Sequence, residues 1–396
     1  MANVLGINIS DLNADQIKIK LSEALAGKDQ CFITTPNPEI ILQSHKDEEL
    51  FFILNQADLS IADGFGLKVA GLFYNEKIPR LTGADLSIDL LALAKESGKR
   101  VAVINWRGGL SNRSDIEKAL SKKYPSLKTL VLDLSRFEST AGLSDLVINR
   151  LNVFSPDIIF CTFGSPYQEK ALYHSLKKLP SVKLALGCGG AFDFITGKLS
   201  RAPLMFRKAG LEWLWRLMKQ PSRIKRIINA VVVFSWKLIA AKFYTRFRYR
   251  PNVACLLYKK GDQGVKILIV ERADAKNHWQ LPQGGTDGES VEIAGARELR
   301  EETNASSIVK KGVFKNIYSY NFPDTYELLR HKFDYKGQKQ SLFIAEFIGN
   351  DLEIKVNYWD HASWKWVDAD KLPNEVHPSR LSGAEMFLKK FKSINL

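Results

Sequence analysis

The sequence predicts an α/β protein with a mostly parallel sheet in its first two-thirds and a separate domain behind it. Two observations support this class. From Leu5 to Gly197, apolar runs of strand length alternate with helical patterns, which is typical of parallel strands joined by crossover helices. The chain also has 396 residues, which is too long for one ordinary domain and sufficient for two or three.

The elements of the first domain follow from these patterns in chain order. The predicted strands are Cys31–Thr35, Leu59–Asp63, Arg100–Asn105, Asp157–Gly164 and Val182–Gly190. The predicted helices are Asp15–Ala26, Pro38–Gln56, Ala84–Glu96, Asn112–Lys123 and Pro166–Leu179. We therefore expect a Rossmann-like domain over residues 1–200. In such sheets ligands bind beyond the carboxyl ends of the strands, so the polar residues after each run are candidate site residues.

Polar motifs of this kind occur along the whole domain. They are TPNPEI (Thr35–Ile40), ADGFG (Ala62–Gly66), PRLTGADL (Pro79–Leu86), FGSPYQEK (Phe163–Lys170) and GGAFDFITGKLSRAP (Gly189–Pro203). Each motif alone is typical of a plain loop. In this order, and followed by GLEWLWRL (Gly210–Leu217) and PSRIKR (Pro221–Arg226), they resemble the TagA/WecG/CpsF family of glycosyltransferases over roughly residues 3–245.

The resemblance implies a reaction and a catalytic centre. It implies inverting transfer of an N-acetylhexosamine-type sugar, such as N-acetylmannosamine or its uronic acid, from UDP to a polyprenyl-diphosphate-linked sugar in cell-surface polysaccharide synthesis. Asp63 matches the family's catalytic aspartate and would deprotonate the acceptor hydroxyl, with a helix N-cap as the alternative role. Arg80 matches the family's arginine and suits a bidentate phosphate contact. Asp85 would cap or orient that arginine, or merely begin the next helix.

Further residues are candidates for substrate binding. Thr35 and Asn37 offer short hydrogen-bonding side chains where the sugar would lie, and Gln168 would contact the ligand similarly. Gly189 and Gly190 would let backbone N–H groups approach the diphosphate. This part of the chain contains no D-x-D motif, so we expect no metal in the transferase domain. The departing diphosphate would instead be covered by arginines of the signature that follows, namely Arg216, Arg223 and Arg226.

The segment 201–250 is strongly basic and is predicted to be an amphipathic appendage and linker. It contains thirteen Lys and Arg residues and one acid, Glu212. Most of the net charge of +14 on the whole chain therefore comes from this segment. Its part from Arg223 to Arg250 mixes apolar, aromatic and cationic residues, which fits a helix lying in an anionic membrane interface. A buried helix, a contact in a homo-oligomer and an RNA-binding role are the alternatives. Pro251 is expected to end the helix.

Other sequence features favour a cytoplasmic protein that is peripheral at the inner face of the cytoplasmic membrane. The N-terminus lacks a basic region followed by an apolar stretch. The chain has no uninterrupted apolar run of about twenty residues, the length that a spanning helix requires. Its four cysteines are isolated from one another, which favours a reducing compartment.

A cluster of carboxylates marks the last third of the chain. Glu298, Glu301 and Glu302 stand at i, i+3 and i+4, so on a helix they share one face. Such carboxylates repel unless a cation lies among them, and oxygen ligands suit Mg²⁺ or Mn²⁺. Gly284 and Gly285 are predicted to turn the backbone ahead of the helix. A solvated acidic helix is the alternative for this stretch taken alone.

The ordered string around this cluster resembles the Nudix box, which is Gly, five residues, Glu, seven residues, then Arg-Glu-aliphatic-x-Glu-Glu-x-Gly. Two departures occur: the loop from Gly284 to Glu289 is one residue short, and Asn304 replaces the closing glycine. With YKGQKQSLF (Tyr335–Phe343) and SWKWV (Ser363–Val367), the domain at 251–396 resembles the dinucleoside polyphosphate and RNA pyrophosphohydrolase branch.

The Nudix resemblance implies an α+β fold in which a mixed sheet lies between helices. It implies Mg²⁺-dependent hydrolysis of a nucleoside diphosphate linked to a moiety X. The implied metal ligands are Glu289, Glu298, Glu301 and Glu302, and the implied substrate-binding residues are Gly284, Gly285 and Arg297. Glu302 and Asp360 are alternative general bases. A UDP-sugar as the hydrolysed substrate, and a non-catalytic nucleotide-sensing module, are the alternative functions of this domain.

Overall fold

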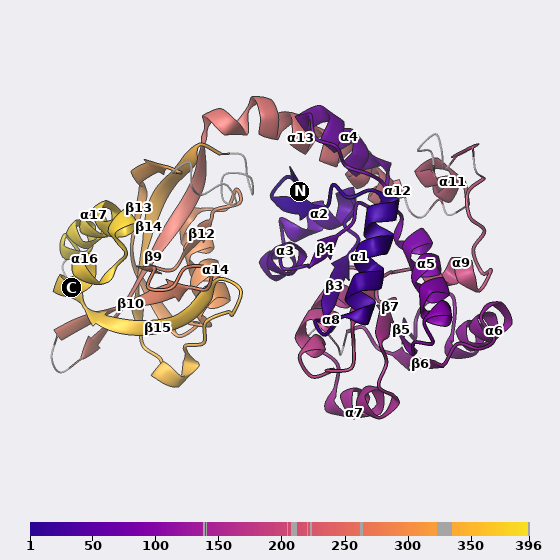
Figure 1. The fold of residues 1–396 in the computed structure, drawn as a ribbon. Helices are drawn as coiled ribbons and strands as arrows, with labels where there is room; N and C mark the ends of the chain where they lie inside the picture. Colours follow the sequence, from indigo (N-terminus) through magenta and orange to yellow (C-terminus); the bar gives the residue numbers. More distant parts are fainter. Residues whose placement is uncertain are drawn as a thin grey trace. The chain divides into compact units, whose positions relative to one another are not determined.

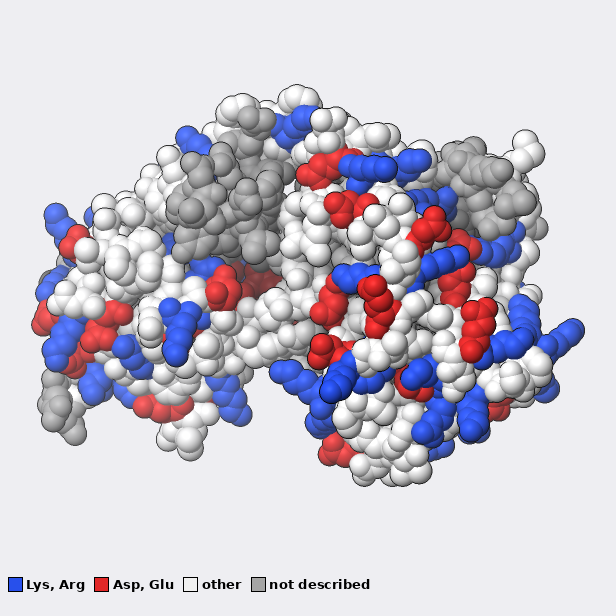
Figure 2. Space-filling view, viewed as in Figure 1, with Lys and Arg blue, Asp and Glu red and all other residues white. Residues whose placement is uncertain are grey.

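The computed structural model describes residues 1–394 apart from 138, 140, 204, 207–211, 220, 222, 223, 262, 263 and 323–334, and it leaves out the side chains of 212, 213, 216, 219, 225, 226 and 246 (Figure 1). The chain divides into two compact units, Met1–Ile239 and Ala240–Leu396. Figure 2 shows acidic and basic side chains interspersed on the visible face of both units.

Six of the described strands form a parallel sheet in the first unit, in the order β4-β3-β8-β7-β5-β6. Their bounds are β3 Cys31–Thr34, β4 Leu59–Ser60, β5 Val101–Trp106, β6 Thr129–Leu134, β7 Ile158–Cys161 and β8 Leu184–Gly187. Successive residues of β5 enter different cores, Val103 on one face and Ile104 on the other. The predicted Rossmann-like sheet is confirmed, and every predicted strand is present. β5 is shifted by one residue from its predicted bounds, and the other four strands are shorter than predicted.

Helices cover both faces of this sheet and bury its apolar side chains. One core contains residues of α1 (Ala14–Ala26), α5 (Gly83–Glu96), α6 (Arg113–Lys123) and α9 (Ala191–Ile195). The other contains residues of α3 (Glu48–Asn55), α7 (Asp145–Phe154) and α8 (Tyr167–Leu176). A hairpin of β1 (Ala2–Val4) and β2 (Ile7–Ile9) precedes the sheet, and α4 spans Phe65–Tyr74.

The predicted helix Pro38–Gln56 is wrong in one respect, because it consists of two helices, α2 (Pro38–Ser44) and α3. The Asp47 carboxylate caps α3 by accepting a hydrogen bond from the backbone N–H of Leu50 at 3.0 Å. This interaction favours a new helix start over continuation of α2. The predictions did not include β6, the β1–β2 hairpin, α4 or α7.

The basic segment is helical over most of its described length. Its elements are α11 (Glu212–Lys219), α12 (Ile224–Ile228), the π-helical η2 (Asn229–Val233), α13 (Phe234–Phe243) and the 3-10 turn η3 (Thr245–Phe247). Among the residues with a described placement, no helix is long and apolar enough to cross a membrane.

The second unit is built on a mixed sheet in which β9 and β14 are parallel and the remaining pairs are antiparallel. Its described strands are β9 (Tyr249–Gly261), β10 (Gly264–Arg272), β11 (Trp279–Gln280), β12 (Gln283–Gly285), β13 (Ile308–Asn321), β14 (Gly337–Phe347) and β15 (His361–Asp368). Helix α14 (Val291–Thr303) packs on one face, and α16 (Leu372–Glu375) and α17 (Leu381–Lys392) pack on the other. The predicted α+β sandwich is confirmed.

Candidate active sites

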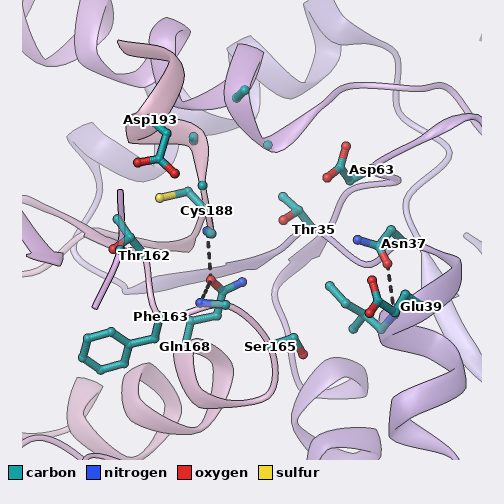
Figure 3. Close-up of a pocket in the computed structure, with 18 of the residues that line it drawn as sticks. Thr35, Asn37, Glu39, Asp63, Thr162, Phe163, Ser165, Gln168, Cys188 and Asp193 are labelled. Carbon is teal, nitrogen blue, oxygen red and sulfur yellow. Dashed lines mark hydrogen bonds between the residues drawn. The ribbon is translucent and has the colours of Figure 1, made fainter. Parts of the chain in front are cut away.

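A cavity of about 1140 Å³ lies at the carboxyl edge of the parallel sheet. Because all the strands run in one direction, the loops that follow them emerge at the same edge. The lining therefore includes a residue from the loop after each strand of the sheet, namely Thr35, Asp63, Gly108, Arg136, Ser165 and Gly189. Figure 3 shows Thr35, Asp63 and Ser165 around this cavity.

Asp63 lies in this cavity on the loop between β4 and α4. Its backbone N–H donates to the carbonyl of Pro36 at 2.9 Å, which joins the loops after β3 and β4. The N-cap of α4 is Gly64, whose φ of 100° suits glycine, and no side-chain hydrogen bond caps this helix. The N-cap alternative for Asp63 is therefore wrong, and Asp63 lines the cavity.

Thr35 and Asn37 line the cavity beside Asp63 (Figure 3). Thr35 is buried, and its hydroxyl donates to the carbonyl of Gly187 at 3.2 Å. Asn37 caps α2 through its carboxamide oxygen, which accepts from the backbone N–H of Ile40 at 3.0 Å. The cap uses the oxygen, so the amide nitrogen of Asn37 is the group that can donate to a ligand.

Gln168 joins two of the loops at the cavity. Its carboxamide oxygen accepts from the backbone N–H of Gly164 at 3.1 Å and from that of Gly189 at 2.9 Å. Its nitrogen donates to the buried Glu169 at 2.8 Å, and burial raises the pKa of Glu169. The backbone N–H of Gly189 is therefore engaged by Gln168, whereas the sequence predicted that it faces a diphosphate. Gly190 also lines the cavity.

Arg80 and Asp85 lie beside the cavity in different surroundings. Arg80 is half-buried on a segment joined to the Asp63 loop, since the N–H of Leu81 donates to the carbonyl of Ala62 at 3.3 Å. The described cavity lining does not include Arg80. Asp85 accepts a hydrogen bond from the Thr82 hydroxyl at 2.6 Å and pairs with Arg201. Asp85 thus fastens the segment after α9 to the start of α5.

Part of the predicted arginine set lies outside the described residues. This holds for Arg223 as a whole and for the side chains of Arg216 and Arg226. The described part of the basic segment nevertheless supplies Trp215, Asn229, Val233 and Lys237 to the cavity lining. The segment therefore contributes to this site.

The cavity also contains residues that the sequence analysis did not select. Asp193 accepts hydrogen bonds from the backbone and the hydroxyl of Ser111, at 3.2 and 2.7 Å. Arg136 lies 3.8 Å from the ring centroid of Trp106 and donates to the carbonyl of Phe163 at 3.2 Å. Arg136 was missed because the strand before it was not predicted; a predicted β6 would have drawn attention to it.

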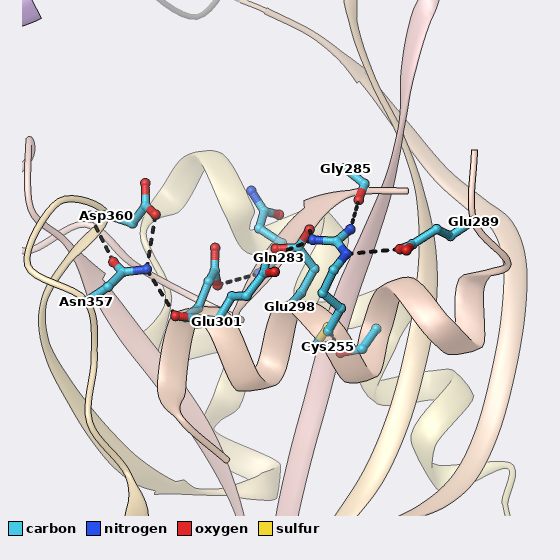
Figure 4. A network of polar contacts seen from close by, with 11 residues as sticks. Cys255, Gln283, Gly285, Glu289, Glu298, Glu301, Asn357 and Asp360 are labelled. Carbon is cyan, nitrogen blue, oxygen red and sulfur yellow. Dashed lines mark hydrogen bonds and ion pairs between the residues drawn. The ribbon is translucent and has the colours of Figure 1, made fainter. Parts of the chain in front are cut away.

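Arg297 contacts three carboxylates of the second unit. Their residues, Glu289, Glu298 and Glu301, are labelled in Figure 4. Arg297 lies 2.9 Å from Glu289, 2.8 Å from Glu298 and 2.8 Å from Glu301. It also donates to the carbonyl of Gly285 at 2.8 Å. Burial lowers the pKa of Arg297, but its bonds to Glu289 and the charge of Glu298 outweigh burial, so the pKa is raised. Arg297 thus pairs with three carboxylates.

Glu302 faces a different set of partners. Its carboxylate accepts from the backbone N–H of Gln283 at 2.9 Å and lies 3.1 Å from Nε2 of His361. The side chains of Glu302 and His361 are both buried. Asp360, the alternative base, accepts from the amide of Asn357 at 3.2 Å, and Asn357 also donates to the carbonyl of Glu301 at 3.3 Å. The loop before β15 therefore approaches the end of α14 (Figure 4).

Gly284 and Gly285 belong to strand β12, so their predicted role as a tight turn is wrong. A Cβ on Gly284 would lie 2.0 Å from the Glu298 carboxylate, and one on Gly285 would lie 2.3 Å from the Arg250 guanidinium. The glycines are required for close approach of these groups. Asn304 at the end of α14 adopts the left-handed conformation with φ 58°, as expected of a glycine substitute.

The glutamate set of α14 fits a hard cation in its chemistry, since every candidate ligand is a carboxylate oxygen. Within the described part of the chain, however, no group of three or more His, Cys, Asp or Glu residues is arranged to hold a metal ion. Arg297 takes the central position among Glu289, Glu298 and Glu301. A metal at this set would be held by Glu298, Glu301 and Glu302.

Two family models match the chain. Residues 2–248 match the model of the glycosyl transferase WecG/TagA/CpsF family. The chain belongs to this glycosyltransferase family. Residues 248–387 match the model of the NUDIX domain. The predicted glycosyltransferase family and the predicted Nudix domain are confirmed, and both domains are of enzyme families. The predicted branch of the Nudix family stays a prediction.

Named relatives cover the transferase part. The chain is 28% identical over 247 residues to an N-acetylglucosaminyldiphosphoundecaprenol N-acetyl-beta-D-mannosaminyltransferase of Staphylococcus aureus strain MRSA252, which covers 61% of this chain and 92% of the relative. The protein of the same name from Bacillus subtilis strain 168 is 29% identical over 205 residues, 50% of this chain and 75% of the relative.

Solved structures cover the NUDIX part. A Caenorhabditis elegans Ap4A hydrolase in a binary complex is 17% identical and covers 36% of this chain and 98% of its own, with a TM-score of 0.29. The Escherichia coli dihydroneopterin triphosphate pyrophosphohydrolase is 20% identical and covers 36% of this chain and 99% of its own, with a TM-score of 0.29.

The role of Arg297 leads to a stability prediction. Arg297→Gln removes the cation beside Glu298, which is 5% exposed, and is expected to lower the unfolding free energy of the NUDIX domain by about 3 kcal/mol. Mg²⁺ is expected to restore part of this loss by neutralising the same carboxylates. Thermal unfolding with and without Mg²⁺ measures both effects. Arg300→Gln, at an exposed site on the same helix, is the control and should cost less than about 1 kcal/mol. Equal effects of the two substitutions would contradict the account.

Proposed function

We propose that the chain is a bifunctional enzyme whose first domain transfers an N-acetylhexosamine-type sugar from UDP to a polyprenyl-diphosphate-linked sugar in cell-surface polysaccharide synthesis. The observation that carries this proposal is the Asp63 carboxylate in a large cavity at the carboxyl edge of the parallel sheet. The names of the relatives, mannosaminyltransferases that use a diphosphoundecaprenol-linked sugar, support N-acetylmannosamine as the sugar.

The proposed reaction is a single displacement. Asp63 takes the proton of the acceptor hydroxyl, the acceptor oxygen attacks the anomeric carbon, and the bond from that carbon to UDP breaks with its electron pair leaving on UDP. Thr35 and the Asn37 amide hold the sugar. Gln168 joins the loops that face the sugar by accepting hydrogen bonds from the backbone N–H groups of Gly164 and Gly189. Arg80, with Arg216, Arg223 and Arg226, neutralises the departing diphosphate. No metal is required in this scheme.

The second domain is proposed to hydrolyse a nucleoside diphosphate linked to X. Glu298, Glu301 and Glu302 hold Mg²⁺ or Mn²⁺, which when bound would neutralise phosphate charge and activate water. Glu302 is the proposed general base, since it is buried beside His361; Asp360 is the alternative. Glu289 stabilises Arg297, and Gly284 and Gly285 on β12 are proposed substrate-binding residues. Two other functions compete with this proposal. The second domain could hydrolyse a UDP-sugar and so limit the supply of donor to the transferase, or it could sense nucleotide without turnover.

The basic segment is proposed to hold the enzyme at an anionic membrane surface, on the inner face of the cytoplasmic membrane. Apolar side chains recur along one side of its helices and are exposed, namely Ile224, Ile228, Val232, Trp236 and Ile239. An exposed apolar stripe with flanking cations is typical of helices that lie in a bilayer interface. A homo-oligomer contact and RNA binding are the competing roles.

Asp63→Asn is expected to lower kcat for sugar transfer by at least about 100-fold, because the amide cannot accept the acceptor proton. The affinity for UDP, measured by calorimetry, should stay within about twofold. The assay uses a panel of UDP-sugars and a lipid-diphosphate acceptor, with EDTA present to test metal independence. Unchanged transfer by the variant would remove Asp63 as the base.

Side-by-side hydrolysis assays with Mg²⁺ test the NUDIX domain. The substrates are dinucleoside polyphosphates, capped-like RNA ends and UDP-sugars, and Glu302→Gln is the matched inactive variant. The proposal predicts nucleotide release from at least one of them and a loss of at least about 100-fold in the variant. Absence of release from every substrate, with nucleotide binding retained, would favour the sensing module.

Sedimentation with phospholipid vesicles tests the membrane proposal. The chain is expected to bind vesicles that contain anionic lipid and to bind purely zwitterionic vesicles weakly. Trp236 belongs to the exposed apolar stripe, and its side chain is 68% exposed. Trp236→Glu should reduce binding, because it places a negative charge on this stripe. Equal sedimentation with both vesicle types, or salt-dependent RNA binding without vesicle binding, would contradict it.

A further inference from the structure

Thr35 and Gln168 lie beside each other in the cavity of the transferase domain, because both side chains contact Gly187 at the end of β8 (Figure 3). The Thr35 hydroxyl is 3.2 Å from the carbonyl oxygen of Gly187. A Cβ on Gly187 would lie 2.8 Å from Nε2 of Gln168, so a glycine is needed for the carboxamide to approach the backbone this closely. Thr35 and Gln168 line the cavity and are 5% and 3% exposed. A ligand therefore meets both side chains at one place.

Toward a ligand, Thr35 is an acceptor of hydrogen bonds. A hydroxyl has one O–H to donate and two lone pairs with which to accept. Because a carbonyl oxygen can only accept, the O–H of Thr35 is committed to the carbonyl of Gly187. Within the part of the chain that the structure describes, the Thr35 hydroxyl makes no second hydrogen bond. Its oxygen is therefore left to accept an N–H or O–H group of a ligand.

Gln168 has the opposite polarity. Its carboxamide oxygen accepts from the backbone N–H groups of Gly164 and Gly189 at 3.1 and 2.9 Å, which occupies both lone pairs and fixes the oxygen end of the group. Its nitrogen has two N–H groups, of which one donates to Glu169 at 2.8 Å. Among the described residues, the other N–H has no acceptor. Gln168 therefore offers a ligand one donor and no acceptor.

Glu169 determines where the nitrogen of Gln168 lies. Glu169 is 1% exposed, and its Oε1 accepts the hydrogen bond from that nitrogen. Its Oε2 is buried without a hydrogen-bond partner among the described residues. Burial of a carboxyl group with an unpaired oxygen costs free energy, so the group is not explained by stability alone. Its contact with Gln168 gives it a function, which is to orient the donor toward the cavity.

A buried acceptor beside a buried donor is complementary to a secondary amide. Such an amide has one N–H, which Thr35 can accept, and one carbonyl oxygen, to which Gln168 can donate. The acetamido group of a 2-acetamido sugar is an amide of this kind, and it is attached next to the anomeric carbon. The residue after Thr35 is Pro36, whose carbonyl accepts from the backbone N–H of Asp63 at 2.9 Å. The pair of side chains therefore belongs to the same loops as the proposed base.

We propose that Thr35 and Gln168 form a binding site for the acetamido group of a sugar substrate, with Glu169 as the positioning residue of Gln168. This inference rests on the proposed transferase function, since it names the chemical group that the same cavity recognises. Two substrates of that function can carry the group. One is the sugar of the UDP donor, and the other is the lipid-linked acceptor sugar, which is an N-acetylglucosamine in the names of the relatives. Exchanging one sugar at a time distinguishes these two sources.

Kinetic specificity is the first test. kcat/KM is compared for UDP-N-acetylmannosamine and UDP-mannose, and for lipid-diphosphate acceptors that end in N-acetylglucosamine or in glucose. The wild-type chain should prefer the acetamido form of one of these sugars by at least about tenfold, because the hydroxyl form leaves a buried donor or acceptor unpaired. Thr35→Val keeps the shape of the side chain but removes the acceptor, so it should reduce this preference to about threefold or less. Thr35→Ser should retain it.

Thr162→Val is the matched control. Thr162 also lines the cavity, but its hydroxyl donates to Asn105 and accepts from the backbone N–H of Trp106, both at 2.9 Å. Its loss should therefore leave the preference for the acetamido sugar unchanged, even where the rates fall. Equal changes of the preference in Thr35→Val and Thr162→Val, or no change in Thr35→Val, would overturn the site.

The role of Glu169 has its own pair of variants. Glu169→Met removes the acceptor for Gln168 and should weaken the preference for the acetamido sugar as Thr35→Val does. Glu169→Gln keeps a carbonyl oxygen at this position and should preserve the preference within about threefold. A merely structural Glu169 would lower the rates with acetamido and hydroxyl sugars by the same factor, and this result would remove it as a positioning residue.

A binding test separates the site from the reaction. The same two donors and two acceptors are titrated singly into the full chain and followed by calorimetry. The site predicts that one acetamido ligand binds at least about tenfold more tightly than its hydroxyl counterpart, and that Thr35→Val removes most of the difference. If the wild-type chain transfers no sugar yet shows this Thr35-dependent difference, the transferase proposal fails and the site stands. If it transfers sugar without preferring an acetamido group on either substrate, the transferase proposal stands and the site is overturned.

Discussion

The common direction of the sheet strands is the constraint on which the transferase domain depends. Parallel strands deliver every following loop to one edge, so Thr35, Asp63 and Gln168 meet in one cavity although long helices separate them in sequence. The buried cores on both faces keep that edge fixed. Gln168 then ties the loops after β7 and β8 together through two backbone hydrogen bonds. These hydrogen bonds join the loops that are proposed to face the donor sugar.

In the NUDIX domain the corresponding constraint is the positive charge of the Arg297 side chain. Arg297 gathers three carboxylates and the carbonyl of Gly285, and the glycines of β12 let these groups approach the backbone. Like charges are stable at such short separation only with a positive charge among them. In the proposed function, Glu298 and Glu301 from this arrangement are also metal ligands.

The sequence was sufficient for the architecture because its signals are local. Continuous apolar runs identified the central strands, and the ordered motifs identified both families. The edge strand β6 was missed because it is only partly buried and carries Asp133 within it. The break before α3 was missed although Asp47 is a favourable N-cap, since the apolar pattern continues across it.

Contacts between distant segments were beyond the sequence. Asp193 bonds to Ser111, 82 residues away, so its place in the cavity has no local signal. Gly284 was read as a turn residue because its neighbour Glu298 comes from a different element. Lys237 counted only as one charge of a basic segment, and its contact with His45 spans 192 residues.

The stereochemistry of the transfer product tests the central claim most directly. A single displacement with Asp63 as base inverts the configuration at the anomeric carbon, because acceptor and UDP occupy opposite sides of it. The one-bond coupling between carbon and hydrogen at that centre, measured by NMR on product made from a UDP-sugar of known configuration, reports the outcome. The account predicts inversion. Retention would require a covalent intermediate or attack on the same face, and would contradict it.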